Sequence, residues 1–274
     1  MNFRILKNRA ALPLAALALL SIAMPARTSA QFGTPPPVAK PPDPRLIAPQ
    51  DFTGYWVSLI TEDWRYRMVT PDKGDYGGVP LNQAGAALAA KWDPAKDDAD
   101  GNACRSYGAA AIMRVPTRLH ITWQDDNTLR VETDAGKQTR LLHFNTTAPE
   151  SGPLEWQGYS VARWEGLRAG GAFRIPTTLL GPGGAQRPAS EGYLHVTTTR
   201  MRSGYLRKNG APYSENAVLD EYFDGFKEEN GDTYLIVTAI VTDPAYLAQP
   251  FITSDQFKKQ ADATGWNPTP CEAK

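Results

Sequence analysis

The sequence predicts an all-β protein, an antiparallel β-barrel of eight to nine strands with one or two short peripheral helices. From residue 118 onward the apolar residues recur with a period of two, which is typical of strands that bury one face. Threonine, valine, tyrosine and tryptophan dominate these segments, as a pleated, half-buried surface prefers. Helical patterns are scarce, and closing many strands into a barrel removes exposed sheet edges.

The strand candidates are short and closely spaced. QDDN and AGK separate the first three segments of the regular region, which predicts a three-stranded meander. KEENGD similarly joins the last two segments into a hairpin. The full set of candidates is 53–59, 64–69, 118–123, 128–134, 138–144, 154–165, 192–201, 217–226 and 233–241.

Two segments have helical features. Residues 81–93 are alanine-rich, with Asn82 as the expected N-cap. Residues 243–249 begin with a capping aspartate and a proline at the first helical position, and Pro250 ends the run. The glycine- and proline-rich stretch 175–192 is expected to form a loop over one end of the barrel.

The first thirty residues have the layout of a cleavable secretory signal. A basic start precedes an apolar run at 10–23, and the small residues Ser29 and Ala30 precede the expected cleavage point. We therefore expect residues 1–30 to be removed and the protein to be periplasmic or secreted, with no stable membrane span afterwards. An uncleaved anchor is the alternative.

The mature chain is expected to consist of a proline-rich tether at 31–50 and a single barrel domain at 51–274. The whole chain carries 29 basic and 29 acidic residues; residues 1–30 hold four of the basic and none of the acidic ones, which leaves 25 − 29 = −4. This mildly acidic balance argues against a nucleic-acid partner. It does not indicate the oligomeric state.

The chain has two cysteines, Cys104 and Cys271. An exported chain meets an oxidising compartment, so a disulfide between them is expected. Metal ligation or a nucleophilic thiol is the alternative, but the chain has no C-x-x-C spacing and no histidine near either cysteine.

Motifs for common cofactors and nucleophiles are missing from the sequence. No G-x-S-x-G, P-loop, dinucleotide fingerprint or H-E-x-x-H occurs, so we expect no cofactor. DDADGN at 97–102 is only superficially similar to a calcium loop. The aligned register places Lys96 at the first ligand position and Tyr107 at the last, so we interpret the segment as an acidic surface turn.

All three histidines lie in predicted strands. Alternation separates His120 from Leu119 and Ile121, and it places His195 in a row of polar residues opposite an apolar row. If the apolar rows pack between the barrel and covering elements, the polar rows line a cavity; in the reverse case they face water. A zinc-type site would need histidines of three strands to converge.

TEDWRYRMVTP, at 61–71, is the most unusual segment. Alternation divides it into one face with Glu62, Trp64, Tyr66 and Met68 and another with Asp63, Arg65 and Arg67. Either the arginines are surface charges, or they point into the barrel and bind an acidic ligand bidentately, with Asp63 fixing one of them. Trp64 is expected to be buried in both cases. The glycines of 73–78 allow Asp75 and Tyr76 to approach the same mouth.

Long motifs carry a resemblance to known proteins. The segments at 54–82, 103–136, 204–223 and 266–271, which include GYWVS, TEDWRYRM, RLHITWQDDNTLR and NPTPC, resemble a family of uncharacterised exported bacterial proteins. This resemblance implies export and no particular reaction. The strand pattern is also similar to that of lipocalin-like, or calycin, barrels, which implies a central cup for a small apolar molecule and no residue roles.

These observations favour a barrel that binds a small, largely apolar molecule with an acidic or carbonyl group. The expected ligand-binding residues are Trp64, Arg65, Arg67, Tyr76, Trp123 and Tyr222. The alternative is a cofactor-independent isomerase, cyclase or lyase acting in the same cavity. Its candidate acids and bases are His120, His195, Glu221 and Asp75. A structural envelope protein would need a large exposed apolar patch, which the alternation does not reveal.

Overall fold

The computed structural model describes residues 41–166 and 192–274. The predicted signal at 1–30, the first half of the predicted tether at 31–50 and all but the last residue of the predicted loop at 175–192 lie outside the described residues. No helix within the described ranges is long and apolar enough to cross a membrane.

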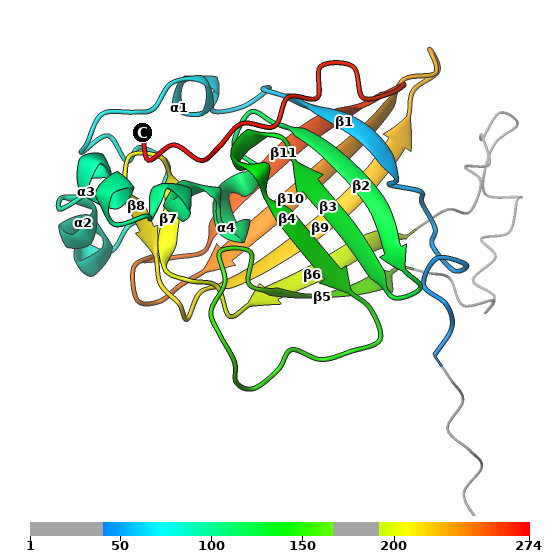
Figure 1. Cartoon of the computed structure of the whole chain (residues 1–274), viewed down its shortest axis with the longest axis horizontal. Helices are drawn as coiled ribbons and strands as arrows, with labels where there is room; N and C mark the ends of the chain where they lie inside the picture. Colours follow the sequence, from blue (N-terminus) through cyan, green and yellow to red (C-terminus); the bar gives the residue numbers. More distant parts are fainter. Residues whose placement is uncertain (1–40, 167–191) are drawn as a thin grey trace, which may run out of the picture. The chain divides into compact units, whose positions relative to one another are not determined.

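Within the described residues, nine strands close into a barrel in the order β1-β11-β10-β9-β6-β5-β4-β3-β2 (Figure 1). Neighbours pair antiparallel, except for β4 and β5, which are parallel. The strands are β1 (Gly54–Leu59), β2 (Arg118–Asp125), β3 (Thr128–Thr133), β4 (Thr139–His143), β5 (Tyr159–Glu165), β6 (Tyr193–Thr199), β9 (Val218–Lys227), β10 (Thr233–Thr242) and β11 (Phe251–Gln260). The predicted class, a mainly antiparallel β-barrel, is confirmed.

The remaining elements gather at one end of the barrel, as Figure 1 shows. They include a separate two-stranded sheet of β7 (Gly204–Arg207) and β8 (Ala211–Tyr213). The helical elements of the described chain are all short: α1 (Trp64–Met68), α2 (Gln83–Ala89), α3 (Pro94–Ala99), the 3-10 turns η1 (Ala103–Tyr107) and η2 (Ala135–Lys137), and α4 (Ala109–Ile112).

The predicted meander forms β2, β3 and β4, and the hairpin at KEENGD joins β9 to β10. Helix α2 begins after Asn82, whose side chain accepts a hydrogen bond from the Gly85 N–H, as its capping role requires. DDADGN contributes to α3 and the turn after it rather than to a simple surface turn.

The helix predicted at 243–249 does not form. Asn82 N–H donates to the Tyr246 carbonyl, and Leu247 forms a β-bridge with Leu81, so backbone groups that a helix needs are bonded elsewhere. Strand β11 was not among the predicted strands because Asp255 interrupts its apolar alternation; the structure buries this residue beside Phe257 on the inward face.

The apolar rows of all nine barrel strands point inward and contribute to one large buried cluster. On β2 these are Leu119 and Ile121, and on β6 they are Leu194 and Val196, each fully buried. Because side chains alternate along a strand, the rows that contain His120 and His195 face outward. Of the two arrangements left open by the alternation, the structure has the apolar rows inside the barrel.

One ion pair lies inside the barrel. Arg140 of β4 donates from Nη1 and Nη2 to the two carboxylate oxygens of Glu221 on β9, over 2.9 and 2.5 Å. Both side chains are essentially unexposed, at 0% and 1%. Thr198 also accepts from Arg140. The bidentate geometry offsets part of the desolvation cost of burying both charges.

Aromatic residues fill the barrel end away from the short helices. The rings of Phe52 and Trp164 lie 5.9 Å apart, and Phe144 lies 5.6 Å from Trp164 and 5.4 Å from Trp123. The chain before β1 packs here, since the Trp164 indole donates to the Pro44 carbonyl. Contacts with the barrel therefore begin several residues before Asp51.

The other end is closed by the short elements. Tyr107, Ile112 and Met113 extend the barrel core at this end. A second buried cluster, including Leu206, Tyr213 and Phe251, joins β7 and β8 to the ends of the barrel strands. This end of the barrel thus has a cap whose side chains come from many short segments.

Replacing Arg140 with methionine should lower the free energy of unfolding by about 3–5 kcal/mol, because Glu221 stays buried without its partner. The double variant Arg140→Met, Glu221→Met should recover most of this loss, because no unpaired charge remains. Urea unfolding followed by tryptophan fluorescence measures both. A double variant that is as unstable as Arg140→Met would contradict this account of the pair.

Candidate functional site: an arginine-lined pocket at the capped end of the barrel

The segment at 61–71 forms helix α1 and its flanks, and the strand predicted at 64–69 is wrong. Asp63 adopts a left-handed conformation with φ of 50°, and its carbonyl accepts hydrogen bonds from the N–H groups of Tyr66 and Arg67. The preceding strand β1 already pairs with β2 and β11. No free edge is left beside β1, so this short segment folds onto the cap instead.

Helix α1 directs one of its arginines into the protein. The Arg67 side chain is 1% exposed and lies 3.2 Å from the fully buried carboxylate of Asp255 on β11. Its Nε donates to the carbonyl of Arg114, 2.9 Å away. Of the two arginines, the predicted inward orientation thus applies to Arg67 alone, and Arg67 reaches Asp255, midway along β11, rather than a ligand cup.

Two further arginines converge on the same place. Arg114, from the segment after α4, is 7% exposed and donates to Asp63 over 2.8 Å. Arg207, at the end of β7, is 3% exposed; it donates to the Gly77 carbonyl and covers the Tyr66 ring at 4.3 Å. Asp63 therefore contacts Arg114 and Arg207, not the arginines of its own segment.

The three guanidiniums hold more hydrogen-bond donors than their surroundings satisfy. Five buried nitrogens have no hydrogen-bond partner among the described residues: Nη1 and Nη2 of Arg67, Nη1 of Arg114, and Nε and Nη2 of Arg207. Some of these nitrogens lie within 4 Å of Asp255, Glu62 or Asp63, but without hydrogen-bond alignment. Buried polar groups are normally paired, so these donors mark a place where an acceptor is needed.

The pKa shifts of the buried arginines and of Asp255 also indicate that an anion would be favourable here. Burial lowers the pKa of Arg67 and of Arg207, and the nearby charge of Arg114 lowers both further. Burial also raises the pKa of Asp255, against the opposing effect of Arg67 and Arg114. The positive charges are therefore poorly solvated and crowd one another, and a bound anion would relieve both effects.

A pocket of about 320 Å³ opens beside these arginines. Its walls come from α1, η1, α4, η2, β7 and the C-terminal segment, and they include all three arginines. The apolar part of the lining is Met68, Val69, Ala111, Val115, Pro116, Ala135 and Leu206. We call this site the arginine pocket. It combines cationic and apolar walls, the pattern of a site for a small amphipathic molecule.

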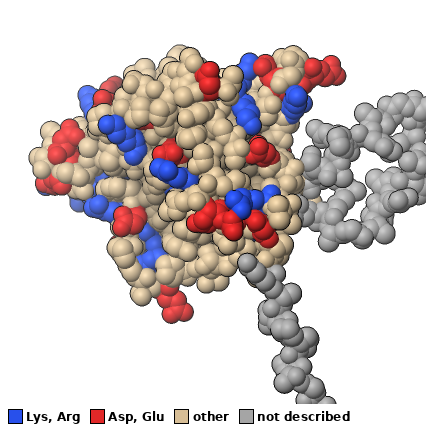
Figure 2. Space-filling model, turned by 45° about the vertical axis from the view of Figure 1, so that its right-hand side comes forward, with Lys and Arg blue, Asp and Glu red and all other residues tan. Residues whose placement is uncertain are grey.

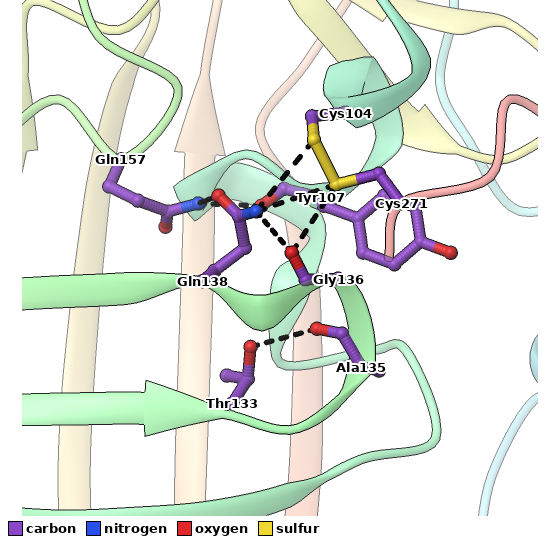
Figure 3. The surroundings of a disulfide bond; sticks show 8 residues. All are labelled: Cys104, Tyr107, Thr133, Ala135, Gly136, Gln138, Gln157 and Cys271. Carbon is purple, nitrogen blue, oxygen red and sulfur yellow. Dashed lines mark hydrogen bonds between the residues drawn. A yellow bond between two sulfur atoms is a disulfide. The ribbon is translucent and has the colours of Figure 1, made fainter. Parts of the chain in front are cut away.

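A disulfide joins two walls of the pocket. Cys104 in η1 is bonded to Cys271 in the C-terminal segment, as predicted. Figure 3 shows the bond beside Gln138, whose amide donates to the Gly136 carbonyl over 2.6 Å and accepts from Gln157. Ser106 and Tyr107 on one side of the bond and Thr269 and Glu272 on the other line the pocket.

Replacing both Cys104 and Cys271 with serine should lower the free energy of unfolding by several kcal/mol. The chain-entropy model gives an upper value of about 5 kcal/mol for a loop of this length; the cysteines are 167 residues apart. Chemical unfolding of the wild type with and without reductant provides the comparison. A reductant that destabilises the serine variant as much as the wild type would show that the disulfide is not responsible.

The other predicted ligand-binding residues of the segment lie outside the pocket. Trp64 is 67% exposed, so the expectation that it is buried is wrong: in a helix it shares the outer face with Met68, which is 59% exposed. Arg65 is also exposed and pairs with Asp75 over 2.8 Å. Tyr76 packs against the second buried cluster.

The remaining two expected ligand-binding aromatics are far from these arginines in the fold. Trp123 belongs to the aromatic end of the barrel, beside Phe144. Tyr222 lies on the outer face of β9, where it stacks on His195 at 4.5 Å. Of the six expected ligand-binding residues, Arg67 lines the arginine pocket.

The four candidate acids and bases do not share a site. His120 on β2 and His195 on β6 face outward, and three strands separate them one way around the barrel and four the other. Glu221 is inside, with both oxygens bound to Arg140. Asp75 lies at the rim of the cap, bonded to Arg65 and to the Tyr66 hydroxyl. Among the described residues, no group of three potential ligands is arranged to hold a metal ion.

Both histidines have partners on the outer surface. His120 stacks on Tyr55 at 4.2 Å, and its Nδ1 lies 3.2 Å from Glu132. His195 is held between Glu165, 2.9 Å from Nδ1, and Asp220, 3.0 Å from Nε2, with Arg163 beside it. Hydrogen bonding from His195 lowers the pKa of Glu165 to about 2, with help from Arg163 and Tyr193.

This depressed pKa predicts a pH-dependent contribution to stability. Glu165 stabilises the folded state above its ordinary pKa of 4.5, and the contribution is lost as the pH falls towards about 2. Glu165→Gln should therefore cost about 1–2 kcal/mol at neutral pH, since partial exposure screens the carboxylate, and much less near pH 2.

Unfolding free energies from pH 7 to pH 2 test this expectation. Glu215→Gln, at an exposed position on the loop before β9, serves as the control and should change stability little at any pH. A cost of Glu165→Gln that is the same at pH 7 and pH 2 would contradict the assigned role of the carboxylate.

Sequence reasoning missed Arg114, Arg207 and Asp255. Asp255 had a usable signal, because it is in phase with Thr253 and Phe257 on one strand face, and a charge in an apolar row indicates burial with a partner. Arg114 follows the apolar run AAAIM, which is a weaker signal of the same kind. Arg207 in GYLRKNG offers none, since polar and turn-forming residues follow it directly.

Comparisons of the chain with protein-family models, with curated proteins and with solved structures found no match. The resemblance of its motifs to a family of exported proteins therefore identifies no family here. Fold and site define the class of protein: a closed, mainly antiparallel nine-stranded β-barrel, within the described residues, with an arginine-lined pocket at its capped end.

Proposed function

We propose that this protein is an exported binding protein for a small, partly apolar molecule with an acidic group, and that the arginine pocket holds the ligand. The observation that carries the proposal is the convergence of three buried arginines, with unpaired donors, on the wall of one pocket. Arginine is the residue best suited to hold an anion by paired hydrogen bonds.

The composition of the pocket supports an amphipathic ligand. Its seven apolar wall residues supply contact area, and the guanidiniums supply orientation, which is the usual division of roles in small-molecule sites. The outer surface does not offer an equivalent anion site on the face that Figure 2 shows, where basic and acidic side chains are interspersed over the described residues.

The barrel interior is a poorer place for this ligand. A lipocalin-like cup would need space between the strands, whereas the inward apolar side chains of the nine strands are packed into two buried clusters. A pocket of about 370 Å³ at the aromatic end, bordered by Phe52, Trp123 and Trp164, is one other place where an apolar molecule could lie. It has one arginine, Arg45, which pairs with acidic residues and is 40% exposed.

Export is proposed from the signal-like start of the sequence. The disulfide supports it, because disulfides persist in oxidising compartments. The enzymatic alternative lacks a comparable observation, since its candidate acids and bases lie on separate surfaces and Glu221 is fully paired. A binding role therefore agrees best with the positions of the charged side chains.

Thermal-shift and calorimetric titrations with medium-chain fatty acids and aromatic carboxylates test the proposal. We expect decanoate or 1-naphthoate to raise the melting temperature, and their amides to have little effect, because the amides lack the charge. Arg67→Gln and Arg114→Gln should each weaken binding at least tenfold, which corresponds to the loss of about 1.4 kcal/mol or more from one charged hydrogen bond.

Two control variants separate binding from folding. Arg130→Gln, on β3 and paired with Glu132, removes an arginine from another surface and should leave binding unchanged. Val69→Asp introduces a negative charge at a position that lines the pocket but is 67% exposed, so it should fold normally and still weaken binding. Binding that survives Val69→Asp, Arg67→Gln and Arg114→Gln unchanged would overturn the assignment of this pocket.

A further inference from the structure

The arginine pocket presents its donors from three directions. Arg67 comes from α1, Arg114 from the segment after α4, and Arg207 from the end of β7. Each contributes at least one buried nitrogen without a hydrogen-bond partner in the described part of the chain, and together they contribute five. Three of the five lie 3.2–3.9 Å from a carboxylate oxygen without hydrogen-bond alignment, and Nη1 of Arg67 and Nε of Arg207 have no such neighbour within the described ranges. A ligand group that satisfies all five must accept from three separate guanidiniums at once.

A carboxylate is poorly matched to this arrangement. It has two oxygens in one plane with about four lone-pair positions, and it is best served by a single arginine fork. A phosphate monoester instead presents three terminal oxygens arranged tetrahedrally, each able to accept more than one hydrogen bond. Its oxygens can face guanidiniums that come from three different segments.

The charge of the cluster also favours a ligand with more than one negative charge. The side chains that are less than a tenth exposed are Arg67, Arg114, Arg207 and Asp255, which gives 3 − 1 = +2. Asp63 and Glu62 are nearby, but they are 42% and 44% exposed, so water screens much of their charge. Lys208 and the exposed Glu272 also line the pocket, and their opposite charges cancel in this count. A phosphate monoester carries a charge of about −1.5 to −2 at pH 7, which is close in magnitude to the positive excess of the buried side chains.

From the number, direction and net charge of these donors, we infer that the acidic group bound in the arginine pocket is a phosphate monoester attached to an apolar group. This inference rests on the proposed function and narrows its ligand class. The apolar walls, including Met68, Val69 and Leu206, then contact the organic part of the ester, while the phosphate lies against the guanidiniums.

Matched ligands with the same apolar group test the inference. Isothermal titration of the purified, disulfide-bonded mature protein at pH 8 compares 1-naphthyl phosphate with 1-naphthoate and with inorganic phosphate. We expect the naphthyl phosphate to bind at least tenfold more tightly than the naphthoate, and more tightly than inorganic phosphate. The preference over the naphthoate should fall at pH 5, where the ester loses its second negative charge.

Arg207→Gln measures the contribution of the third guanidinium. This variant should reduce the affinity for naphthyl phosphate more than the affinity for naphthoate. The ratio of the two affinities should therefore approach one. Arg130→Gln is the matched control and should leave the ratio unchanged. Circular dichroism shows whether Arg207→Gln folds. If it does not, Val69→Asp replaces it. Val69→Asp should weaken the binding of naphthyl phosphate more than the binding of naphthoate, because the new carboxylate repels a dianion more strongly.

The results distinguish this inference from the broader proposal. Naphthoate binding equal to or tighter than naphthyl phosphate, with both lost in the Arg67→Gln variant, would overturn the phosphate assignment and leave the binding of an acidic molecule in place. An absence of binding by naphthyl phosphate, naphthoate and the fatty acids alike would overturn both. A tenfold preference that persists in Arg207→Gln would also overturn the role of three converging guanidiniums.

Discussion

Closure of the sheet through β1 is the constraint on which the other features of this fold depend. β1 is hydrogen-bonded to β2 on one side and to β11 on the other, so the barrel has no open edge at this point. Because side chains alternate along each strand, closure forces one set of rows into the interior and the other outward. The rows that fill the interior are the apolar ones, since burying them provides the main driving force for folding.

This same closure accounts for the positions of the charged groups. Arg140, Glu221 and Asp255 are in phase with apolar residues and are therefore carried inside, where each needs a partner of opposite charge. Arg140 and Glu221 pair with one another inside the barrel. Asp255 contacts arginines of the cap, and its main partner, Arg67, comes from α1. The α1 segment cannot extend the sheet beside β1, because both edges of β1 are already paired. The buried acid thus places Arg67, and Arg67 forms part of the arginine pocket.

The two ends of the barrel differ in chemistry for this reason. The far end holds stacked aromatic rings beneath the chain that leads into β1. At the capped end, short segments from across the sequence meet, and the disulfide holds two of them together beside the pocket. Three arginines can lie close together there because several carboxylates surround them. These carboxylates leave some of the guanidinium N–H donors without a hydrogen bond. Excess donors in a fixed position are suited to holding an anion without large reorganisation.

The sequence by itself determined the class of fold, the meander, the β9–β10 hairpin, the N-cap of α2 and the disulfide, because each depends on local periodicity, local capping chemistry or the presence of only two cysteines. It also identified Arg67 as a residue of interest. Tertiary structure alone decided that 64–68 is helical, that Trp64 is exposed, that the histidine rows face outward, and that Arg114 and Arg207 join Arg67. These features depend on which strand edges are already paired and on contacts between segments as far apart as Arg67 and Asp255, and the periodicity of one segment contains no information about either.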